Sequence, residues 1–375
     1  MRARIGDRMH GIFGGAMTSA PRTPLSVVIP SYNSAPWLPS TLDALAVAVR
    51  AAGTRVEVIV VDDGSTDGSV AVVQALADEF PGDLVVISQE NSGRFLARWA
   101  GLERASADLV LLLDSRVVVA PDSVSYLLAA VASDPAPAGW NGHVHTDPSS
   151  PLVGRFWEVP TFVFWGGYLR DPRPFDLTPS TFDSAPKGTG AFLARTATMR
   201  AAFRQAWPEG DAKLISDDTK VLRWIAENGG IRLDPGFSAT YRPRTTVGGF
   251  VRHSFDRGTL FVDSYAGTSV LRSVVLLFAA IAPVLGVGLI VGLIAIGAGI
   301  AAGAVALGAL LLLLAPLVPA AVNHCPPRAS LAYASYVLIF LVPFWSGLLR
   351  GLVIHRGAFF DRSRSTGTTA GKALS

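Results

Sequence analysis

Asp114 and Arg116 are the two residues of this chain whose types and spacing say most about chemistry. Asp114 ends the apolar run LVLLL, and Arg116 follows two positions later. A carboxylate at the end of a strand can bind Mg²⁺ or Mn²⁺, or accept a hydrogen bond from a ribose hydroxyl. Arg116 stands where a second carboxylate would complete a metal site. The question is therefore whether a metal, a fixed guanidinium or neither acts here.

Two further acidic pairs have positions that suit ligand binding. Asp62 and Asp63 end the run VIVV, and Gly64 lets the backbone turn tightly beside a ligand. A carboxylate there can accept from a nucleobase or a ribose, although Asp and Gly are also common in solvated turns. Asp217 and Asp218 stand at a helix start, where the helix dipole favours negative charge. Asp217 serves equally well as a simple N-cap, whereas Asp218 can take the proton of a hydroxyl group.

Two basic groups are suited to bind an anion. Lys187 is followed by Gly188, so an ammonium group and a bare backbone can both approach a phosphate or a sugar. Arg252, His253 and Arg257 come just before a long apolar run. Such a juxtamembrane cluster commonly contacts anionic lipid head groups. Binding of an anionic acceptor or of a leaving diphosphate is an equally good interpretation.

Alternating strands and helices are expected to position these residues. The sequence predicts strands at 25–33, 56–61, 83–90 and 107–116, and helices at 36–52, from the following turn to about Phe80, at 92–105 and at 121–133. This alternation predicts an α/β domain with a mostly parallel sheet covered by helices on both faces. Ligands of such sheets bind at the carboxyl ends of the strands, where both acidic strand ends fall.

The later part of the domain gives a weaker pattern. Residues 135–184 are rich in Pro, Gly and aromatic residues without clear periodicity, which indicates a long excursion over the sheet edge. Patterning returns with KGTGAFLAR, and a helix is expected from about Asp217 to Asn228, with Gly229 as its stop.

The C-terminal third predicts a membrane region. Only 16% of all residues are charged, against roughly 25% in soluble proteins. Residues 273–327 and 329–349 contain no Asp, Glu, Lys or Arg. A spanning helix needs about 20 apolar residues, so spans are expected at about 271–293, 299–321 and 331–352. The net charge of +3 is small, and the basicity is not that of a nucleic-acid-binding protein.

The charges that flank these spans conflict with their number. Arginines precede the first span and follow the last one (Arg244, Arg252, Arg257, Arg272; Arg350, Arg356, Arg362, Arg364). By the positive-inside rule both flanks belong in the cytoplasm, which requires an even number of crossings. Either the last stretch, which contains Pro343 and Trp345, is re-entrant or interfacial, or the C-terminal tail lies outside.

Residues 1–24 form a basic tail that lacks a continuous apolar core, and Met17 is an alternative start. This tail makes a weak secretion signal, so the following domain is expected in the cytoplasm. The single cysteine, Cys325, excludes an intramolecular disulfide and a multi-cysteine zinc site.

Four motifs in order resemble those of family 2 glycosyltransferases, which have the GT-A fold. They are VVIPSYN, VIVVDDGSTDGS, QENSGRFLARWAGLERASADLVLLLD, and GTGAFLAR followed by SDDT. The resemblance covers about residues 24–260. It implies a disordered tail at 1–24, a GT-A domain at 25–260, two or three transmembrane helices at 261–355 and a polar basic tail at 356–375.

The resemblance also implies roles for individual residues. The nucleotide sugar would be bound at the carboxyl edge of the sheet (Pro30, Tyr32, Asn33, Asp62, Asp63, Arg94, Arg98, Asp114, Arg116). Asp114 matches the first acid of the family's metal-binding Asp-X-Asp. Asp218 matches the catalytic base, which supports in-line attack with inversion. The acceptor or diphosphate would contact the remaining candidates (Lys187, Gly188, Asp217, Arg252, His253, Arg257).

Two positions depart from the family pattern. Trp99 replaces a frequent Asn, which affects packing at most. Arg116 replaces the last acid of Asp-X-Asp, and three interpretations stay open. Arg116 supplies some or all of the metal's charge; or Mg²⁺ or Mn²⁺ still binds through Asp114, phosphates and water; or catalysis has been lost.

The leading functional interpretation is a membrane-bound inverting glycosyltransferase of the cytoplasmic membrane. It would move a sugar from a nucleotide sugar, UDP-linked by family expectation, to a lipid-linked or cell-envelope glycan. One alternative is a polyprenyl-phosphate sugar synthase, and another is a non-catalytic scaffold that binds a nucleotide sugar. Membrane lipids are the expected surroundings, and the sequence leaves the sugar, the acceptor and the oligomeric state open.

Overall fold

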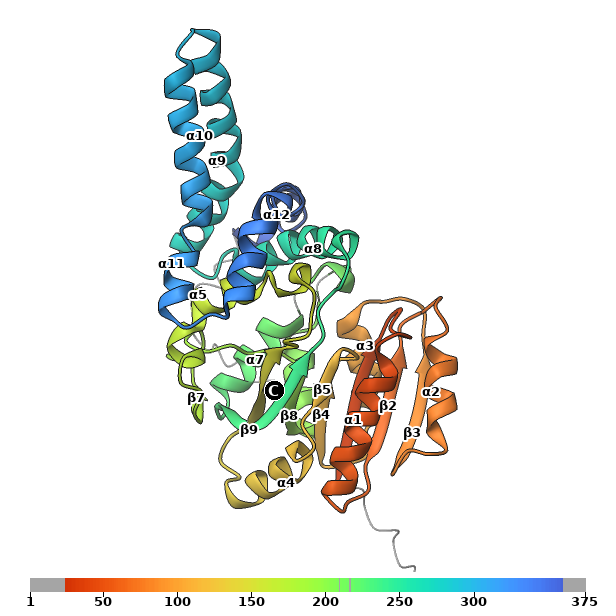
Figure 1. The fold of residues 1–375 in the computed structure, drawn as a ribbon. Helices are drawn as coiled ribbons and strands as arrows, with labels where there is room; N and C mark the ends of the chain where they lie inside the picture. The colour runs from red at the N-terminus through yellow and green to blue at the C-terminus, as the bar shows by residue number, and fades with distance from the viewer. Residues whose placement is uncertain (1–23, 209, 216, 360–375) are drawn as a thin grey trace, which may run out of the picture.

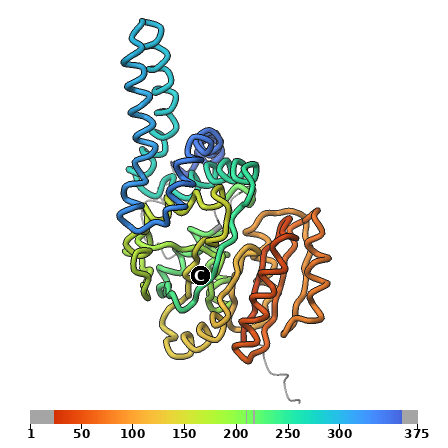
Figure 2. The backbone as a smooth tube through the Cα atoms, viewed as in Figure 1, coloured from red at the N-terminus to blue at the C-terminus, as the bar shows by residue number. Residues whose placement is uncertain are grey.

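The computed structural model describes residues 24–208, 210–215 and 217–359. These residues form a sheet domain, a helical layer on top of it, and a long helical hairpin that projects from that layer (Figures 1 and 2). The Met17 alternative, the basic tail and most of the C-terminal tail lie outside the described residues.

In the described part of the chain nine strands form one sheet, ordered β3-β2-β1-β4-β8-β6-β9-β5, with β7 paired to β9. Their bounds are β1 Leu25–Ser31, β2 Glu57–Asp62, β3 Asp83–Ser88, β4 Leu109–Leu113, β5 Val117–Val119, β6 Gly139–Thr146, β7 Phe175–Leu177, β8 Ala191–Arg195 and β9 Ile231–Tyr241. The first four strands of that order are parallel, and β6 is also parallel to β9. β8 runs antiparallel to both of its neighbours. The predicted mostly parallel sheet is confirmed, with a mixed half added to it.

Helices cover both faces of this sheet. They are α1 Leu38–Ala51, α2 Ser69–Ala77, α3 Arg94–Arg104, α4 Ser123–Ser133, α6 Thr196–Gln205 and α7 Asp217–Glu227. One core contains residues of α1 and α4, and the second contains residues of α3, α6 and α7. Every residue of β1 and of β2 is buried, as expected for strands covered on two sides. Trp99 packs in the second core, with its ring centroid 5.4 Å from that of Trp207.

The expectation for residues 135–184 is wrong in one respect. This stretch contains α5 Glu158–Leu169 and the short β7. However, it also supplies β6, which lies inside the sheet between β8 and β9. The sequence GWNGHVHT of this strand interrupts alternation with Gly, Asn and His. Its first four residues are buried on both sides, so the two-residue period on which a sequence prediction depends is absent.

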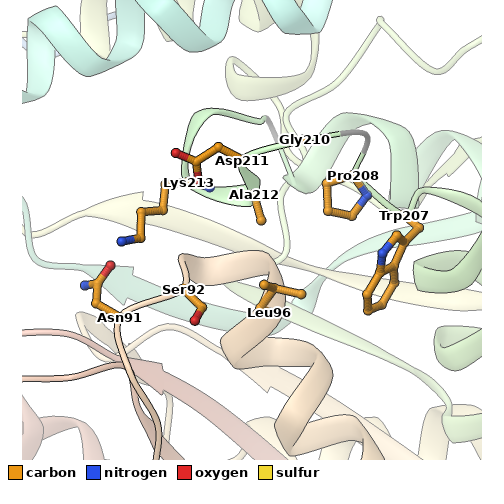
Figure 3. A pocket seen from close by; sticks show the side chains of 9 residues that line it. All are labelled: Asn91, Ser92, Leu96, Trp207, Pro208, Gly210, Asp211, Ala212 and Lys213. Carbon is orange, nitrogen blue, oxygen red and sulfur yellow. Dashed lines mark hydrogen bonds between the residues drawn. The ribbon is translucent and has the colours of Figure 1, made fainter.

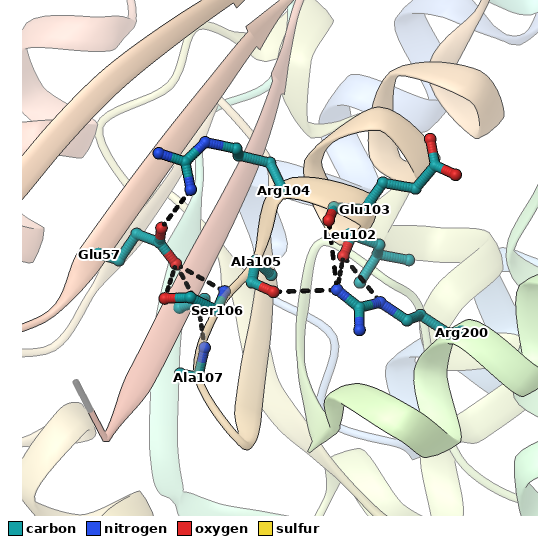
Figure 4. Close-up of polar contacts among 9 residues, drawn as sticks. Glu57, Leu102, Glu103, Arg104, Ala105, Ser106, Ala107 and Arg200 are labelled. Carbon is teal, nitrogen blue, oxygen red and sulfur yellow. Dashed lines mark hydrogen bonds and ion pairs between the residues drawn. The ribbon is translucent and has the colours of Figure 1, made fainter. Parts of the chain in front are cut away.

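Two polar groups join neighbouring elements near the amino edge of the first half of the sheet (Figure 4). The buried carboxylate of Glu57 accepts hydrogen bonds from the Ser26 hydroxyl at 2.7 Å and from the Ser106 backbone N–H at 2.9 Å. The guanidinium of Arg200 donates to the backbone oxygens of Leu102 and Ala105 at the end of α3. A cation that satisfies the last carbonyls of a helix stabilises its C-terminus. These contacts hold α3, which carries the basic residues of the site, in place.

The C-terminal region is all-helical, as predicted, with α8 Val247–Tyr265, α9 Val270–Ala295, α10 Gly299–Leu314, α11 Leu317–Val322 and α12 Pro327–Ile354. Within the described ranges, three helical segments are long and apolar enough to cross a membrane, at residues 270–295, 299–322 and 327–354. α9 and α10 form the projecting hairpin, whereas α12 packs beside α8 and runs in a different direction (Figure 1).

Glycines bring α8 and α12 into close contact. A Cβ atom at Gly347 would clash with the Phe255 backbone oxygen, and one at Gly351 would lie 2.7 Å from the Thr259 oxygen. The Thr259 hydroxyl donates to the Gly347 oxygen at 3.1 Å. Small residues allow such close packing of two helices. α12 is therefore joined to α8 along much of its length.

Candidate active site

The loops after β1 and β2 are fastened to each other at the carboxyl edge of the sheet. The backbone N–H of Asn33 donates to the Ser65 hydroxyl, and that of Ser34 donates to the Ser69 hydroxyl, both at 2.9 Å. The Asn33 side-chain oxygen accepts from the Thr66 N–H at 2.9 Å. Asn33 itself has a φ of 48°, in the left-handed region that Asn tolerates better than most residues. The predicted nucleotide loop is therefore rigid before any ligand binds.

Asp63 fastens the end of β2 to the connection between β3 and α3. Its carboxylate is 4% exposed and accepts from Gln89 Nε2 and the Ser92 N–H at 2.7 Å, and from the Gly93 N–H at 2.8 Å. Asp62 is equally buried, and its Oδ1 has no hydrogen-bond partner among the described residues. The arrangement gives Asp63 a structural role and leaves Asp62 with an open acceptor atom.

The side chain of Tyr32 stands free at the same edge. It is 52% exposed, whereas Pro30 lies within β1 and the whole strand is buried. An exposed aromatic ring beside a rigid loop offers a flat surface on which a base or a sugar can stack.

Arg98 joins the two acids of greatest chemical interest. Its side chain is 1% exposed, and its Nη2 lies 2.7 Å from Asp114 Oδ1. Its Nη1 lies 3.6 Å from Asp218 Oδ1. Asp114 follows β4 and Asp218 belongs to the first turn of α7, so one guanidinium from α3 brings three separate elements together. Asp217 begins α7, and its side chain is outside what the structure describes.

The KGTG segment passes between these two carboxylates. The Thr189 hydroxyl donates to Asp218 Oδ1. The Gly188 N–H donates to Asn141 Oδ1 at 3.0 Å. A Cβ at Gly190 would lie 3.2 Å from Asp114 Oδ2, and one at Gly188 would lie 3.9 Å from Asp218 Oδ2. Glycine therefore allows the backbone to approach both acids.

The environment keeps Asp218 ionised. Burial alone would raise its pKa, but Arg98, Arg94, the Thr189 hydroxyl and Arg257 together lower the pKa below the usual value for Asp. The Asp218 side chain is 38% exposed, so it can still meet a ligand. An ionised, accessible carboxylate is the form that a general base requires.

Arg116 is held in a fixed direction. Its backbone oxygen accepts from the Arg242 N–H at 2.9 Å, and the neighbouring Ser115 oxygen accepts from the Thr41 hydroxyl. The guanidinium carbon lies 4.4 Å from the centroid of the Trp37 ring. Its Nη1 is buried and has no hydrogen-bond partner in the described part of the chain. Arg116 is therefore a stacked cation with an unused donor.

Further cations surround the same space. We call Arg94, Arg116, Arg244 and Arg257 the arginine cluster. All four lower the pKa of His253, which burial already places well below its usual value, so this imidazole is neutral at neutral pH. Burial and the neighbouring arginines likewise lower the pKa of Arg244 and of Arg257. Arginine stays charged despite such shifts. The positive charges of the arginine cluster repel one another, and a bound anion would reduce this repulsion.

A comparison of the sequence with known families indicates the kind of domain that contains these residues. Residues 26–157 match the sequence model of glycosyl transferase family 2. The chain carries a family 2 glycosyltransferase domain. The matched residues contain the first-loop, Asp62–Asp63, Arg98 and Asp114 motifs, and the resemblance drawn from those motifs is confirmed.

Two curated relatives are both named undecaprenyl-phosphate 4-deoxy-4-formamido-L-arabinose transferase. The protein of Pseudomonas paraeruginosa is 38% identical over 109 residues, which are 29% of this chain and 32% of the relative. That of Shewanella sediminis is 34% identical over 106 residues, 28% of this chain and 32% of the relative. The chain thus spans about a third of the length of the curated relatives it matches.

Solved structures with a similar course of the chain include other transferases. Mannosyltransferase PcManGT from Pyrobaculum calidifontis, in complex with GDP-Man and Mn²⁺, is 19% identical with a TM-score of 0.44, covering 91% of this chain and 88% of that one. S. aureus TarS 1–349 in complex with UDP is 13% identical with a TM-score of 0.44, covering 89% and 91%. The fold assignment rests on the strand order given above.

Among the residues that the structure describes, one of the two acids of the family's metal-binding Asp-X-Asp is replaced by a cation. No three His, Cys, Asp or Glu side chains there converge on one point. Asp114 is engaged by Arg98, and the second acid of Asp-X-Asp is Arg116. A divalent cation at Asp114 would lie beside one guanidinium and close to another, and like charges repel. The residues present do not fit a bound metal.

Two other candidate residues, Lys187 and Arg252, form no hydrogen bond or ion pair with Asp114 or Asp218 among the described residues. Lys187 Nζ lies 3.8 Å from Asp183 Oδ1 and 4.2 Å from the Phe182 ring centroid. Burial lowers the pKa of Lys187 to about 8. Arg252 is exposed on α8, where it acts against the burial that raises the pKa of Asp256. The structure brings His253 and Arg257 among the arginines of the site.

Sequence reasoning missed three functional candidates. The sequence analysis assigns Arg244 only to the membrane flank, does not name Trp37, and includes Thr189 only within the motif GTGAFLAR. Each contacts or faces a residue that the sequence did identify, so the missing information was spatial proximity.

The structure also contains a pocket of about 360 Å³ that the sequence did not predict (Figure 3). Its lining includes Ser92, Leu96, Trp207 and Lys213, and it lies apart from Asp114 and Asp218.

Proposed function

We propose that this protein is a membrane-bound, inverting glycosyltransferase that moves a sugar from a nucleotide sugar to a lipid-linked or cell-envelope glycan acceptor. The observation that carries this proposal is the arrangement of Asp114, Arg98 and Asp218 at the carboxyl edge of the sheet of a family 2 domain. A base and a charged strand end are held there within the reach of one buried guanidinium.

The proposed reaction follows from the roles of these groups. An acceptor hydroxyl loses its proton to the Asp218 carboxylate as its oxygen attacks the anomeric carbon. The bond from that carbon to the diphosphate oxygen breaks, and the nucleoside diphosphate leaves with the electron pair. Attack from the opposite side inverts the anomeric centre. Asp218 is suited to this step because the surrounding arginines keep it ionised.

A second acceptor class has its own support. The two relatives are named as transferases that act on undecaprenyl phosphate, and the arginine cluster could bind a lipid phosphate. A phosphate acceptor is already anionic and needs no base. A polyprenyl-phosphate sugar synthase is therefore the second candidate.

The structure supports a membrane arrangement with two crossings. At one end of α12, Arg328 donates to the Pro148 oxygen at 3.2 Å. At the other end, His355 Nδ1 lies 3.8 Å from Asp263, which pairs with Lys220 of α7 at 3.1 Å. A helix of 28 residues is about 42 Å long, yet both of its ends contact the sheet domain or α8. We infer that α12 lies along the membrane surface and that α9 and α10 alone cross it.

This arrangement removes the conflict between charge and span number. Two crossings place both arginine-rich flanks on one side, which the positive-inside rule assigns to the cytoplasm. The glycosyltransferase domain would then face the cytoplasm at the membrane surface. Accessibility labelling of single cysteines introduced at exposed Arg173 and Gly357, in a Cys325→Ser background, tests this. Labelling of both from the same side supports two crossings, and labelling from opposite sides contradicts them.

The function is tested by transfer assays with detergent-purified protein. UDP-, GDP- and dTDP-sugars are supplied with either a polyprenyl phosphate or a polyprenyl-linked sugar. Transfer to the linked sugar that is lost in Asp218→Asn supports the hydroxyl acceptor. Transfer to the phosphate that survives this substitution supports the second candidate. Binding of a nucleotide sugar with no transfer to any acceptor would instead indicate the non-catalytic scaffold.

A further inference from the structure

Arg116 occupies the place of a metal ligand but has the properties of a metal substitute. Its direction is fixed by the backbone bonds of Ser115 and Arg116 and by stacking on Trp37. Its Nη1 is buried without a hydrogen-bond partner among the described residues. A buried donor of this kind is costly unless a ligand uses it. The unused donor therefore points to a ligand with acceptor oxygens.

The charges around this donor favour an anion over a cation. Among the described side chains, the arginine cluster and Arg98 supply five guanidinium groups. Asp114 and Asp218 are the carboxylates that act on Arg257. His253 is neutral at neutral pH, because burial and the arginines lower its pKa. The arginines named here outnumber these carboxylates, which disfavours Mg²⁺ and suits a diphosphate.

Asp114 binds an arginine with one of its two carboxylate oxygens. Its Oδ1 accepts from Arg98 at 2.7 Å, so the guanidinium occupies one of the oxygens a metal would use. Arg98 is 1% exposed, and its removal would leave two carboxylates without their common cation. The first acid of the family motif is thus retained as an anchor for an arginine.

We propose that Arg116, together with Arg244 and Arg257, neutralises the diphosphate of the donor in place of a divalent metal. The planar guanidinium can donate two parallel charge-assisted hydrogen bonds to phosphate oxygens, and the cluster also stabilises the negative charge of the leaving diphosphate. This inference rests on the proposed function, because it names how that site binds its donor. It predicts nucleotide binding that is independent of Mg²⁺ and Mn²⁺.

The test measures binding of UDP, GDP and dTDP to the detergent-purified full chain by isothermal titration calorimetry. Each nucleotide is titrated in EDTA and in Mn²⁺, first with the unchanged protein. The expected result is that one nucleotide binds with affinities that agree within about threefold in the two conditions. Binding that appears only with Mn²⁺ overturns the inference and leaves the proposed function standing.

Variants then assign the effect to Arg116. Arg116→Ala is expected to weaken binding in EDTA at least tenfold, the order expected for a lost charge-assisted hydrogen bond. Arg116→Lys keeps the charge but not the planar fork and should fall between the two. Arg173→Ala removes an exposed surface arginine and serves as the matched control. Unchanged affinity of Arg116→Ala in EDTA would contradict the role of Arg116.

Arg116→Asp provides the sharpest variant, because it restores the second acid of Asp-X-Asp. It should bind the nucleotide poorly in EDTA and recover at least tenfold on addition of Mn²⁺. A variant that recovers has folded, so loss of structure cannot explain the result. Absence of nucleotide binding in every condition would overturn both the inference and the proposed function.

Discussion

The two acidic strand ends of the sheet, Asp62–Asp63 after β2 and Asp114–Arg116 after β4, are built in opposite ways. At the first, the Asp63 carboxylate receives three hydrogen bonds from the β3–α3 connection and is closed off from solvent. At the second, Asp114 is 28% exposed and Arg116 has an unused donor. At the first strand end the chain itself satisfies the Asp63 carboxylate, whereas at the second a guanidinium donor is left for a ligand.

This difference separates residues that shape the site from residues that act in it. Asp63 fixes the loops on which Tyr32 and Arg94 stand, and a substitution there should affect folding first. Arg116 makes few contacts that folding needs, and a substitution there should affect binding first. Arg98 belongs to both classes, because it holds the carboxylates of two elements.

The largest effect is expected for Arg98→Met, which removes the buried cation that pairs with Asp114 at the second strand end. Asp114 and Asp218 would lose their common cation and repel each other. Breaking a buried pair costs about 3–5 kcal/mol, and the partial exposure of both acids reduces this to roughly 2–4 kcal/mol. We expect the thermal midpoint to fall by several degrees and transfer to be lost.

The double variant Arg98→Met/Asp114→Asn is the control for this prediction. Neutralising one acid removes most of the repulsion, so the double variant should regain part of the lost stability without regaining activity. A midpoint for Arg98→Met that equals that of the unchanged protein would show that the pairing with Asp114 has no structural weight.

A smaller loss of stability is expected for Asp63→Asn, which breaks the first strand end. An amide offers one acceptor oxygen, so at least one of the Ser92 and Gly93 N–H groups would lose its partner or face an NH₂ group. An unsatisfied buried donor costs about 1–3 kcal/mol. Differential scanning fluorimetry should show a lowered midpoint, while exposed Asp78→Asn at the end of α2 should show none.

The comparison of strand ends fails if Asp63→Asn is as stable as the Asp78→Asn control while its nucleotide affinity falls. Asp63 would then contact the ligand directly, as the resemblance to the family implied. Arg116→Ala should give the reverse pattern, with a midpoint near that of the unchanged protein and a loss of affinity.

The sequence predicted the elements of the first half of the sheet because each strand there is a continuous apolar run. β1 and β2 are covered on both faces, so Val, Ile and Leu occupy consecutive positions and the runs are easily recognised. β6 could not be found this way, since its polar and small residues are buried by neighbouring strands far along the chain. A sequence pattern indicates burial only where it repeats along the strand itself. The burial of β6 is due to strands that are distant in the sequence.

The same limit applies to the site. Asp114, Asp218 and Arg98 were identified by motif, but nothing in their spacing says that Arg98 lies between the two acids. Arg244 was placed at the membrane flank because it precedes α8 in the chain, whereas the fold returns it to the arginine cluster. The stacking of Arg116 on Trp37 joins residues 79 positions apart and has no sequence signature.

The smallest effect is expected for Gly190→Ala at the second strand end. This substitution adds a methyl group beside Asp114 and leaves every charge unchanged. A Cβ at Gly190 would lie 3.2 Å from Asp114 Oδ2, so Gly190→Ala should displace that carboxylate by a few tenths of an ångström. At Gly188 a Cβ would lie 3.9 Å from Asp218 Oδ2, which is an ordinary contact, so Gly188→Ala is the matched control. We expect Gly190→Ala to weaken nucleotide binding by roughly threefold to tenfold, or about 1 kcal/mol, with little change in midpoint. Equal affinities for the two variants would mean that the position of Asp114 is not what sets the direction of the surrounding arginines.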